Sequence, residues 1–397
     1  MRAAAAAHQG RAPGAGDADA PDQLGAWQAV AIPGATCGRG APFKYYLSAS
    51  ARPDAGIFFL LNGGGACLKD GRAPAGAAGI GKSLYCMDFP NFEDTVMSDA
   101  VFTGLASGLV GNAIPHFNRA DAANPFRDFH FAAVPYCTGD VFAGGMAAPY
   151  DYDPDPGATF EVTHRGHLNF LGVVEDMYRR YPADVPVVLS GMSAGGFGAI
   201  YNFPEVIERW PRTVLIPDSG IAPPQPQSLL AREGARVADR WGARGRLPAY
   251  CATDDCLGDT QRLLAAHAAQ WDGRAGPWRP FGYLASQQDA TLADYLEISK
   301  CGYQLGLRRA LGRPQPPNLR AYIPATDKHV FSFVIDPANP LGGARPFTSR
   351  GGVGVLAWFR QVATAASADA LPPDAVDPWL GCNATFLPAA WGMAAPR

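Results

Sequence analysis

The chain has 397 residues, 48% of them hydrophobic and 17% charged, and its formal net charge is −3. This composition is that of a globular protein, and the lack of a basic run argues against nucleic acid or an anionic membrane as a partner. No apolar run in the sequence approaches the ~20 residues needed to span a bilayer.

The first 22 residues are rich in Ala, Gly and Asp and lack the apolar segment of a signal peptide or membrane anchor, so we expect residues 1–22 to be a disordered leader. No repeat or linker divides residues 23–397, which we expect to form a single domain. Its first predicted elements are two strands, Ala26–Ile32 and Phe43–Leu47, with a turn at Pro33–Gly34 between them.

A fully apolar strand is predicted at Ile57–Leu61, and it leads directly into a run of three glycines. Residues 70–127 contain much Gly, Asn and Pro and little periodicity, which indicates long loop insertions. A further strand is predicted at Phe129–Val134. From Arg165 to Tyr181 apolar residues recur at helical spacing, which predicts an amphipathic helix.

The stretch Val185–Tyr201 combines a strand, a sharp turn and the start of a helix. Gly191–Gly195 has the pattern G-x-S-x-G, in which small residues let the backbone turn tightly and present Ser193 Oγ above the edge of a sheet. The N–H groups of the following helix would face an oxyanion formed at Ser193. An incidental serine in a glycine-rich turn is the alternative, but the strand before it and the helix after it favour a nucleophile elbow.

The helix before the elbow and the strand that enters it form a parallel crossover, which predicts an α/β fold. We expect an α/β-hydrolase-like architecture, with a mostly parallel central sheet flanked by helices. The other predicted strands are Thr213–Ile216, Phe281–Ser286 and Leu319–Ile323, and the other predicted helices are Pro226–Arg240, Asp259–Trp271, Ala290–Leu311 and Val353–Ala366.

A serine nucleophile needs a base within hydrogen-bond reach, and in α/β-hydrolases the acid and the histidine follow the serine in the chain. Of the seven histidines only His267 and His329 follow Ser193. His267 lies inside a predicted helix, whereas His329 lies on a loop just after the last predicted core strand. His329 is therefore the candidate base, and an ordinary surface histidine is its alternative role.

Two aspartates follow predicted strands in positions that supply the acid in this architecture. Asp289 follows the penultimate core strand and is our candidate, although it also precedes a helix and could be its N-cap. Asp218 follows the strand after the elbow and stays open as the alternative acid. Asp327 is too close in sequence to His329 to orient it easily.

An acyl-transfer site also needs donors aimed at the oxyanion. Gly64 and Gly65, in the triple glycine after a buried strand, are typical of a loop whose backbone N–H groups approach the substrate, and Ala194 follows the nucleophile. We predict these three residues as the oxyanion hole. A phosphate cradle is excluded because no G-x-x-x-x-G-K-[ST] pattern is present.

The eight cysteines form no C-x-x-C pair and none lies at a finger-like distance from a histidine pair, so we expect no metal site. Their even number fits up to four disulfides in a secreted or periplasmic protein, although no export signal is visible. The sequence does not choose the pairing, but Cys251 and Cys256 are the easiest to imagine bridged. Free buried thiols in a cytosolic protein are the alternative.

Taken together, these motifs resemble the pectin acetylesterase and Notum family of carboxylesterases. The resemblance covers roughly residues 40–335 and implies an α/β-hydrolase with a Ser193, Asp289 and His329 triad. It also implies exported, disulfide-bonded relatives that remove acyl groups from carbohydrate or protein without a metal or organic cofactor. The matching segments, in the order of the family, are Leu61–Cys67, Val134–Asp140, Ser190–Gly196, Gln287–Asp289 and Asp327–His329.

The chain departs from the family pattern at three positions. Ala66 stands where members usually have Trp, which would open or reshape the acyl pocket. Met192 and Val330 stand where many eukaryotic members carry cysteines, so their disulfide pattern does not transfer to this chain.

The sequence therefore predicts a serine carboxylesterase, a monomer without cofactor. The family resemblance implies that its substrates are small acyl esters, such as acetyl esters, on a polysaccharide. Hydrolysis of lipid or polyester is one alternative, and a non-catalytic carbohydrate- or protein-binding module on the same fold is another. Four aromatic residues in the long loops would either stack on sugar rings or anchor the loops: Tyr85, Phe89, Phe92 and Tyr150.

Overall fold

The structure is a computed structural model. It describes residues 25–75, 80–89, 92, 113–151, 157–251, 254–274, 276–332 and 346–382. The predicted leader, residues 1–22, lies outside the described residues, as does part of the predicted long-loop region.

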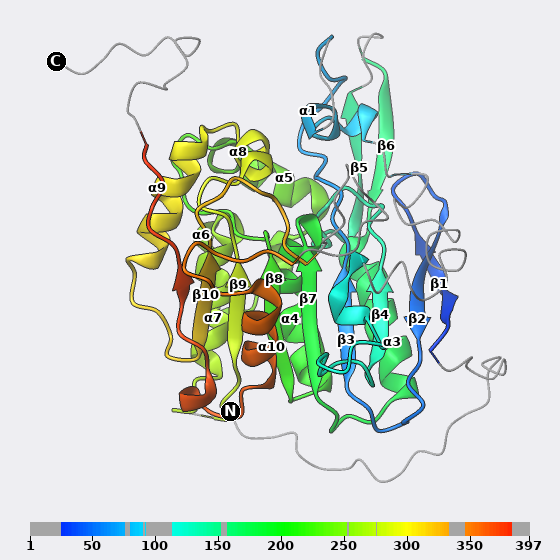
Figure 1. Ribbon diagram of the computed structural model, residues 1–397. Helices are drawn as coiled ribbons and strands as arrows, with labels where there is room; N and C mark the ends of the chain where they lie inside the picture. The colour runs from blue at the N-terminus through cyan, green and yellow to red at the C-terminus, as the bar shows by residue number, and fades with distance from the viewer. Residues whose placement is uncertain are drawn as a thin grey trace.

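A nine-stranded sheet organises the described part of the chain (Figure 1). Its spatial order is β1-β2-β4-β3-β7-β8-β9-β10-β11. The strands are β1 (Trp27–Thr36), β2 (Pro42–Ser48), β3 (Ile57–Leu61), β4 (His130–Val134), β7 (Val187–Met192), β8 (Thr213–Asp218), β9 (Phe281–Leu284), β10 (Leu319–Ile323) and β11 (Ala375–Val376). A separate hairpin pairs β5 (Met146–Asp151) with β6 (Thr159–His164).

Every neighbouring pair from β4 to β11 is parallel, and only β2 runs antiparallel to its neighbours. The chain moves from β3 outward to β4 on one side and later from β7 outward to β11 on the other. The boundary between β3 and β7 is thus the topological switch point, where α/β sheets usually bind ligands outside the carboxyl ends of the strands. The predicted mostly parallel sheet of an α/β-hydrolase-like fold is confirmed.

Helices cover both faces of this sheet. They are α1 (Ile80–Ser83), α3 (Gly166–Arg180), α4 (Ala194–Arg209), α5 (Leu229–Trp241), α6 (Asp254–Gly258), α7 (Thr260–Gln270), α8 (Ala290–Tyr295), α9 (Lys300–Leu311) and α10 (Val355–Thr364). Strand β3 shows why helices are needed on both faces of the sheet, because all five of its residues are buried. Ile57, Phe59 and Leu61 pack with α3, α4, α7 and α9, whereas Phe58 and Leu60 pack with α10.

Side-chain caps explain where several helices begin. Ser228 caps α5, Asp259 caps α7, Asp289 caps α8 and Ser299 caps α9, each accepting a hydrogen bond from a backbone N–H three residues later. The cap at Ser299 also divides the single helix predicted at Ala290–Leu311, which is therefore wrong. Helix α8 ends at Tyr295 and α9 begins at Lys300, with the intervening Glu297 at φ 53°.

Two further differences concern strands. The predicted turn at Pro33–Gly34 is wrong, because β1 continues to Thr36. In place of a turn, the pairing of β1 with β2 shifts register between Ala31 and Thr36, where Gly34 adopts a φ of 73°. The hairpin of β5 and β6 was not predicted: β5 contains Pro149 and shows no alternation of apolar and polar side chains, although β6 does alternate.

All eight cysteines form disulfides: Cys37–Cys137, Cys67–Cys86, Cys251–Cys256 and Cys301–Cys382. The expected count of four and the expected local bridge at Cys251–Cys256 are confirmed. The other three pairs join cysteines 19, 81 and 100 residues apart.

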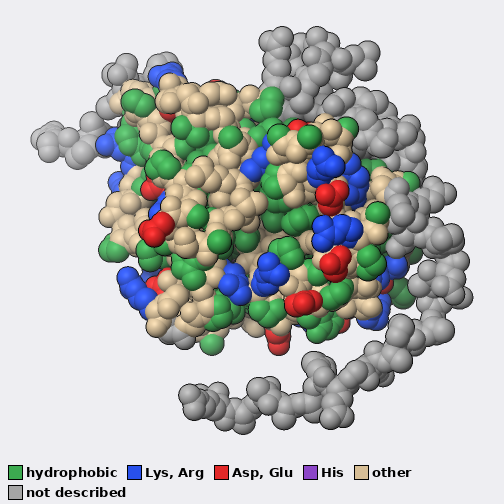
Figure 2. Space-filling view, turned by 60° about the horizontal axis from the view of Figure 1, so that its bottom comes forward, with side chains coloured by type: hydrophobic (Ala, Val, Ile, Leu, Met, Phe, Trp, Pro, Cys, Tyr) green, Lys and Arg blue, Asp and Glu red, His purple; other side chains and the backbone are tan. Residues whose placement is uncertain are grey.

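Charges on the surface are mixed. On the face shown in Figure 2, Lys and Arg side chains lie next to Asp and Glu side chains and do not form separate patches. Among the described helices, none combines the length and apolar character that crossing a membrane requires.

Candidate active site

Ser193 lies at the junction of β7 and α4, at the carboxyl edge of the sheet beside the switch point. Its φ of 55° and ψ of −121° are strained for a residue other than glycine, as expected of a nucleophile elbow. The turn is possible because Gly195 has no side chain: a Cβ there would lie 2.0 Å from Leu61 O. The Ser193 N–H donates to Asp218 O at 2.9 Å, which fixes the turn to the end of β8.

His329 and Asp289 come from loops that follow β10 and β9, and they meet at the same edge. His329 Nδ1 lies 2.8 Å from Asp289 Oδ2. The other oxygen of Asp289, Oδ1, accepts from Leu292 N at 2.9 Å as the N-cap of α8. Asp289 is fully buried, and it thus has both of the roles considered from the sequence, as N-cap and as partner of the histidine.

A carboxylate oxygen only accepts hydrogen bonds, so the contact with Asp289 implies that Nδ1 carries the imidazole proton. The other nitrogen, Nε2, is buried and has no hydrogen-bond partner among the described residues. It therefore does not bond to Ser193 Oγ in this structure. A base poised in this tautomer has the free lone pair that accepting a proton requires, and such contacts often tighten only when substrate binds.

Asp218, the alternative acid, is fully buried at the end of β8 and does not contact the imidazole. Its Oδ2 accepts from Phe331 N at 2.7 Å and from Ser332 N at 2.5 Å. Burial raises the pKa of Asp218, and the hydrogen bonds from Ser332 and Phe331 oppose that rise. Its oxygens are thus used to hold the backbone that follows His329.

The predicted oxyanion loop lies against the nucleophile. A Cβ on Gly63 would lie 2.8 Å from both Met192 O and Ser193 Cβ, so the loop backbone contacts the elbow directly. Gly64 and Gly65 adopt φ values of 155° and 87°. Ala194 is the first residue of α4, and its N–H belongs to the first turn, which has no intrahelical acceptors.

Gly65 also requires the absence of a side chain, because a Cβ there would lie 1.9 Å from Tyr295 Oη. Tyr295, on α8, hydrogen-bonds to Ser83 on α1. Ala66 is buried in an apolar cluster with Leu68, Leu84, Val237, Ala238, Trp241 and Tyr295, among others. Relatives are expected to carry Trp at this position, whereas here the cluster around Ala66 adjoins a cavity, since Val237, Ala238 and Trp241 also line it.

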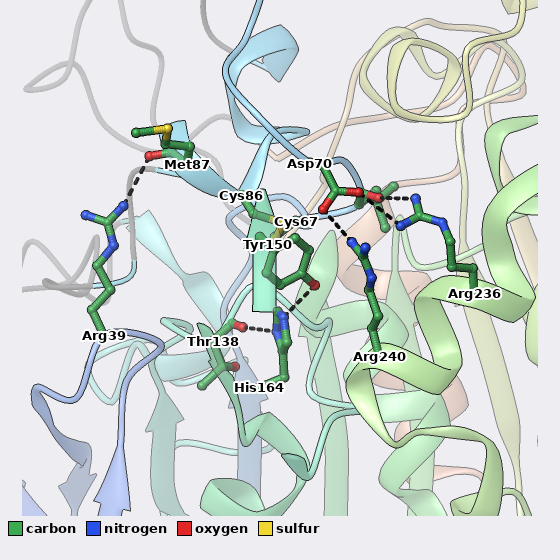
Figure 3. Close-up of a disulfide and its surroundings, with 11 residues drawn as sticks. Arg39, Cys67, Asp70, Cys86, Met87, Thr138, Tyr150, His164, Arg236 and Arg240 are labelled. Atoms are coloured by element: carbon green, nitrogen blue, oxygen red, sulfur yellow. Dashed lines mark hydrogen bonds and ion pairs between the residues drawn. A yellow bond between two sulfur atoms is a disulfide. The ribbon is translucent and has the colours of Figure 1, made fainter. Parts of the chain in front are cut away.

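The chain beyond the glycine loop is braced on several sides, as Figure 3 shows. Cys67 is bridged to Cys86, and Asp70 pairs with Arg240 at 2.7 Å and with Arg236 at 3.3 Å, both on α5. Lys69 pairs with Glu297 in the connection between α8 and α9. These contacts tie the loop to α5 and to the connection between α8 and α9. Helices α5 and α8 lie above the sheet in Figure 1.

The other described histidines are buried in the core, in contrast to His329, whose side chain is 17% exposed. His267 contacts Ile200 O at 2.9 Å and Tyr250 Oη at 2.7 Å, and burial lowers its pKa to about 4. This agrees with the prediction that His267 is a helix residue and not the base. His164, which contacts Thr138 O and Tyr150 Oη, has a pKa lowered by burial.

Three of the four loop aromatics that could have stacked on sugars are buried. Phe89, Phe92 and Tyr150 are at most 4% exposed, so they anchor loops, and only Tyr85 is partly exposed. A cavity of about 530 Å³ between α5, α6 and α7 contains none of the predicted site residues. Within the described ranges, no group of three metal-binding side chains is positioned to hold an ion.

Sequence reasoning overlooked the residues that support the site. Ser219 and Tyr295 carry no motif of their own, and their positions depend on contacts with segments more than 100 residues away. The end of β8 did give a signal, since Asp218 and Ser219 follow a buried strand on the same edge as Ser193.

Comparisons with known proteins give a family match and a similar solved structure. Residues 113–229 match the model of the Pectinacetylesterase family. No curated protein matches the chain. A solved structure of the Wnt deacylase Notum from Drosophila is similar at 16% identity, with a TM-score of 0.47, and the match covers 78% of this chain and 86% of that one.

The predicted resemblance to the pectin acetylesterases is thus confirmed, with the match of the family model confined to residues 113–229. That segment contains Ser193 and Asp218 and ends before Asp289 and His329. The family match supports a hydrolase of the carboxylesterase type.

Proposed function

We propose that this protein is a serine carboxylesterase in which Ser193 is the nucleophile, His329 the base and Asp289 the acid. The observation that carries this proposal is the 2.8 Å contact between His329 Nδ1 and Asp289 Oδ2, which leaves Nε2 without a partner at the sheet edge that bears the strained Ser193.

In the first half of the reaction, Ser193 Oγ bonds to the ester carbonyl carbon while His329 Nε2 takes the hydroxyl proton. The N–H groups of Gly64, Gly65 and Ala194 stabilise the negative charge on the carbonyl oxygen. The bond between that carbon and the alcohol oxygen then breaks, and His329 gives its proton to the leaving alcohol.

In the second half, water attacks the acyl-enzyme and His329 takes a proton from it. Release of the carboxylic acid returns a proton to Ser193 Oγ, and the enzyme is regenerated. Asp289 holds the imidazole in the productive tautomer and stabilises its charged form in both halves. No step requires a metal or an organic cofactor.

We propose a small acyl group, acetyl first, on a polysaccharide. The match to the pectinacetylesterase family supports an acetylated carbohydrate. The four disulfides support export from the cytoplasm, since disulfides persist in oxidising compartments. The protein is proposed to act as a monomer.

The test is hydrolysis of p-nitrophenyl esters from acetate to palmitate by wild type and Ser193→Ala, with circular dichroism to check that both are folded. Turnover that is greatest on acetate and absent in Ser193→Ala supports the proposal and justifies measuring acetate release from acetylated polysaccharides. A maximum on long chains would instead favour a lipid or polyester esterase. A folded wild type that hydrolyses no ester would contradict the esterase proposal and favour a binding module.

A further inference from the structure

Asp218 contacts both halves of the proposed catalytic machinery. It is the last residue of β8, it is fully buried, and it pairs with Met192 across the sheet. Its backbone oxygen accepts the N–H of Ser193 at 2.9 Å. A Cβ on Gly196 would lie 2.6 Å from the same oxygen, so the first turn of α4 rests directly on Asp218.

The side chain of Asp218 holds the segment that follows His329. Oδ2 accepts from Phe331 N and Ser332 N at 2.7 Å and 2.5 Å. Oδ1 accepts from Ser219 Oγ at 3.1 Å, and Ser219 Oγ in turn accepts from Val330 N at 3.0 Å. The three consecutive N–H groups after His329 are therefore all bound by Asp218 or by its neighbour.

This segment would not keep its shape unaided. Val330 has a φ of 65° and Ser219 a φ of 54°, and for a β-branched residue such as Val330 this is a costly conformation. Strained residues of this kind persist where surrounding contacts hold them. Losing the carboxylate would remove two acceptors at once and let the loop that carries His329 relax.

We propose that Asp218 is a positioning residue that fixes the nucleophile turn and the base loop relative to each other. This inference rests on the proposed function. Asp218 acts through its hydrogen bonds to the backbone. Among the described residues, the hydrogen-bond partner of the imidazole is Asp289. A carboxylate that only stabilised the fold would affect stability without changing turnover by the folded enzyme.

The chain offers a matched control in Asp140, another fully buried aspartate whose oxygens accept from backbone N–H groups. Its oxygens accept from Phe142 N and Gly144 N at 3.1 Å and from Gly166 N at 2.7 Å, and none of these residues belongs to the base loop. Asp140→Ala should therefore lower stability without lowering kcat of the folded fraction.

For Asp218→Ala we expect kcat on p-nitrophenyl acetate to fall about 100-fold, as a displacement of about 1 Å in a catalytic group does, with KM changed less than about threefold. Asp218→Asn should recover most of this loss. Its amide oxygen can accept from Phe331 and Ser332, and its NH₂ group can donate to Ser219 Oγ. Equal kcat in wild type and Asp218→Ala, or the same loss in Asp140→Ala, would overturn the inference.

A second measurement is independent of turnover. The Nδ1 proton of an imidazole bonded to a carboxylate gives a separate downfield proton NMR signal, assigned here by its loss in His329→Ala. We expect Asp218→Ala to broaden or shift this signal and Asp140→Ala to leave it unchanged; an unchanged signal in Asp218→Ala would contradict the inference.

If Asp218→Ala does not fold, Ser219→Ala takes its place. It removes the acceptor of Val330 N and one donor to Asp218 but keeps the carboxylate that binds Phe331 N and Ser332 N, so we expect a smaller effect in the same direction. If wild type hydrolyses no ester, the proposed function fails and the NMR comparison still tests the positioning role.

Discussion

Replacing Asp289 by Asn tests the proposed acid, because the two oxygens of this carboxylate have different partners. Oδ2 contacts His329 Nδ1 at 2.8 Å, and Oδ1 accepts from Leu292 N at 2.9 Å. An asparagine has only one oxygen, so it can keep one of these two interactions and must direct its NH₂ group at the other partner.

If the amide oxygen stays on Leu292, the NH₂ group meets Nδ1 and favours the imidazole tautomer protonated at Nε2, which cannot take the serine proton. In a serine protease this change lowers kcat by about 10⁴, or about 5.4 kcal/mol. If the amide flips, the productive tautomer returns, but the helix cap is lost, which costs about 1 kcal/mol. The NH₂ group then also faces the N–H of Leu292, and leaving these two buried donors without an acceptor costs a further ~1–3 kcal/mol. We therefore expect a decrease in kcat of about 10²–10⁴.

The assay is kcat on p-nitrophenyl acetate together with thermal unfolding. Asp327→Asn is the matched control, on the loop that carries His329. Asp327 is 58% exposed and pairs only with Lys300 among the described residues, so kcat of this variant should stay within about twofold of wild type. Folded Asp289→Asn that keeps more than a tenth of wild-type kcat would refute the reasoning. Loss of most turnover in Asp218→Asn, with Asp289→Asn near normal, would make Asp218 the acid.

Three further predictions concern stability. Replacing both cysteines of Cys37–Cys137, which lie 100 residues apart, should lower the free energy of unfolding in urea by about 4.7 kcal/mol. The same change at Cys251–Cys256, which lie 5 residues apart, should lower it by about 2 kcal/mol, and equal losses would contradict this loop-closure account. Burial lowers the folded pKa of His267 from 6.5 to about 4, so the unfolded state binds the extra proton and stability should fall as pH drops below about 6.5, by about 1.4 kcal/mol per unit. His267→Gln should reduce the slope of stability against pH by about that amount between pH 6 and 4, while the other buried histidines keep their share of it. An unchanged slope would exclude a contribution from His267. Gly195→Ala should abolish folding or activity because its Cβ would lie 2.0 Å from a backbone oxygen of β3, whereas Gly245→Ala, with open space around it, should retain both in expression and activity measurements.

Local sequence was sufficient to predict much of the sheet and its most conspicuous turn. Buried parallel strands read as short apolar runs, and Ile57–Leu61 was predicted with the bounds that the structure has. The order of strands and the crossover helix implied a parallel sheet, and parallel strands place their carboxyl ends at one edge. For this reason residues at strand ends far apart in the chain, such as Asp289 and His329, could be expected to meet.

What the sequence could not decide depends on contacts between distant segments. Asp218 and Asp289 both end up at the carboxyl edge, and only the packing of the loops after β9 and β10 determines that Asp289 contacts the imidazole while Asp218 binds the backbone beyond it. Three of the four disulfide pairs and the strained φ of Val330 have the same origin, because they are set by neighbours in space and not in sequence. The chain thus determined which residues reach the site, and the tertiary structure decided what each of them contacts there.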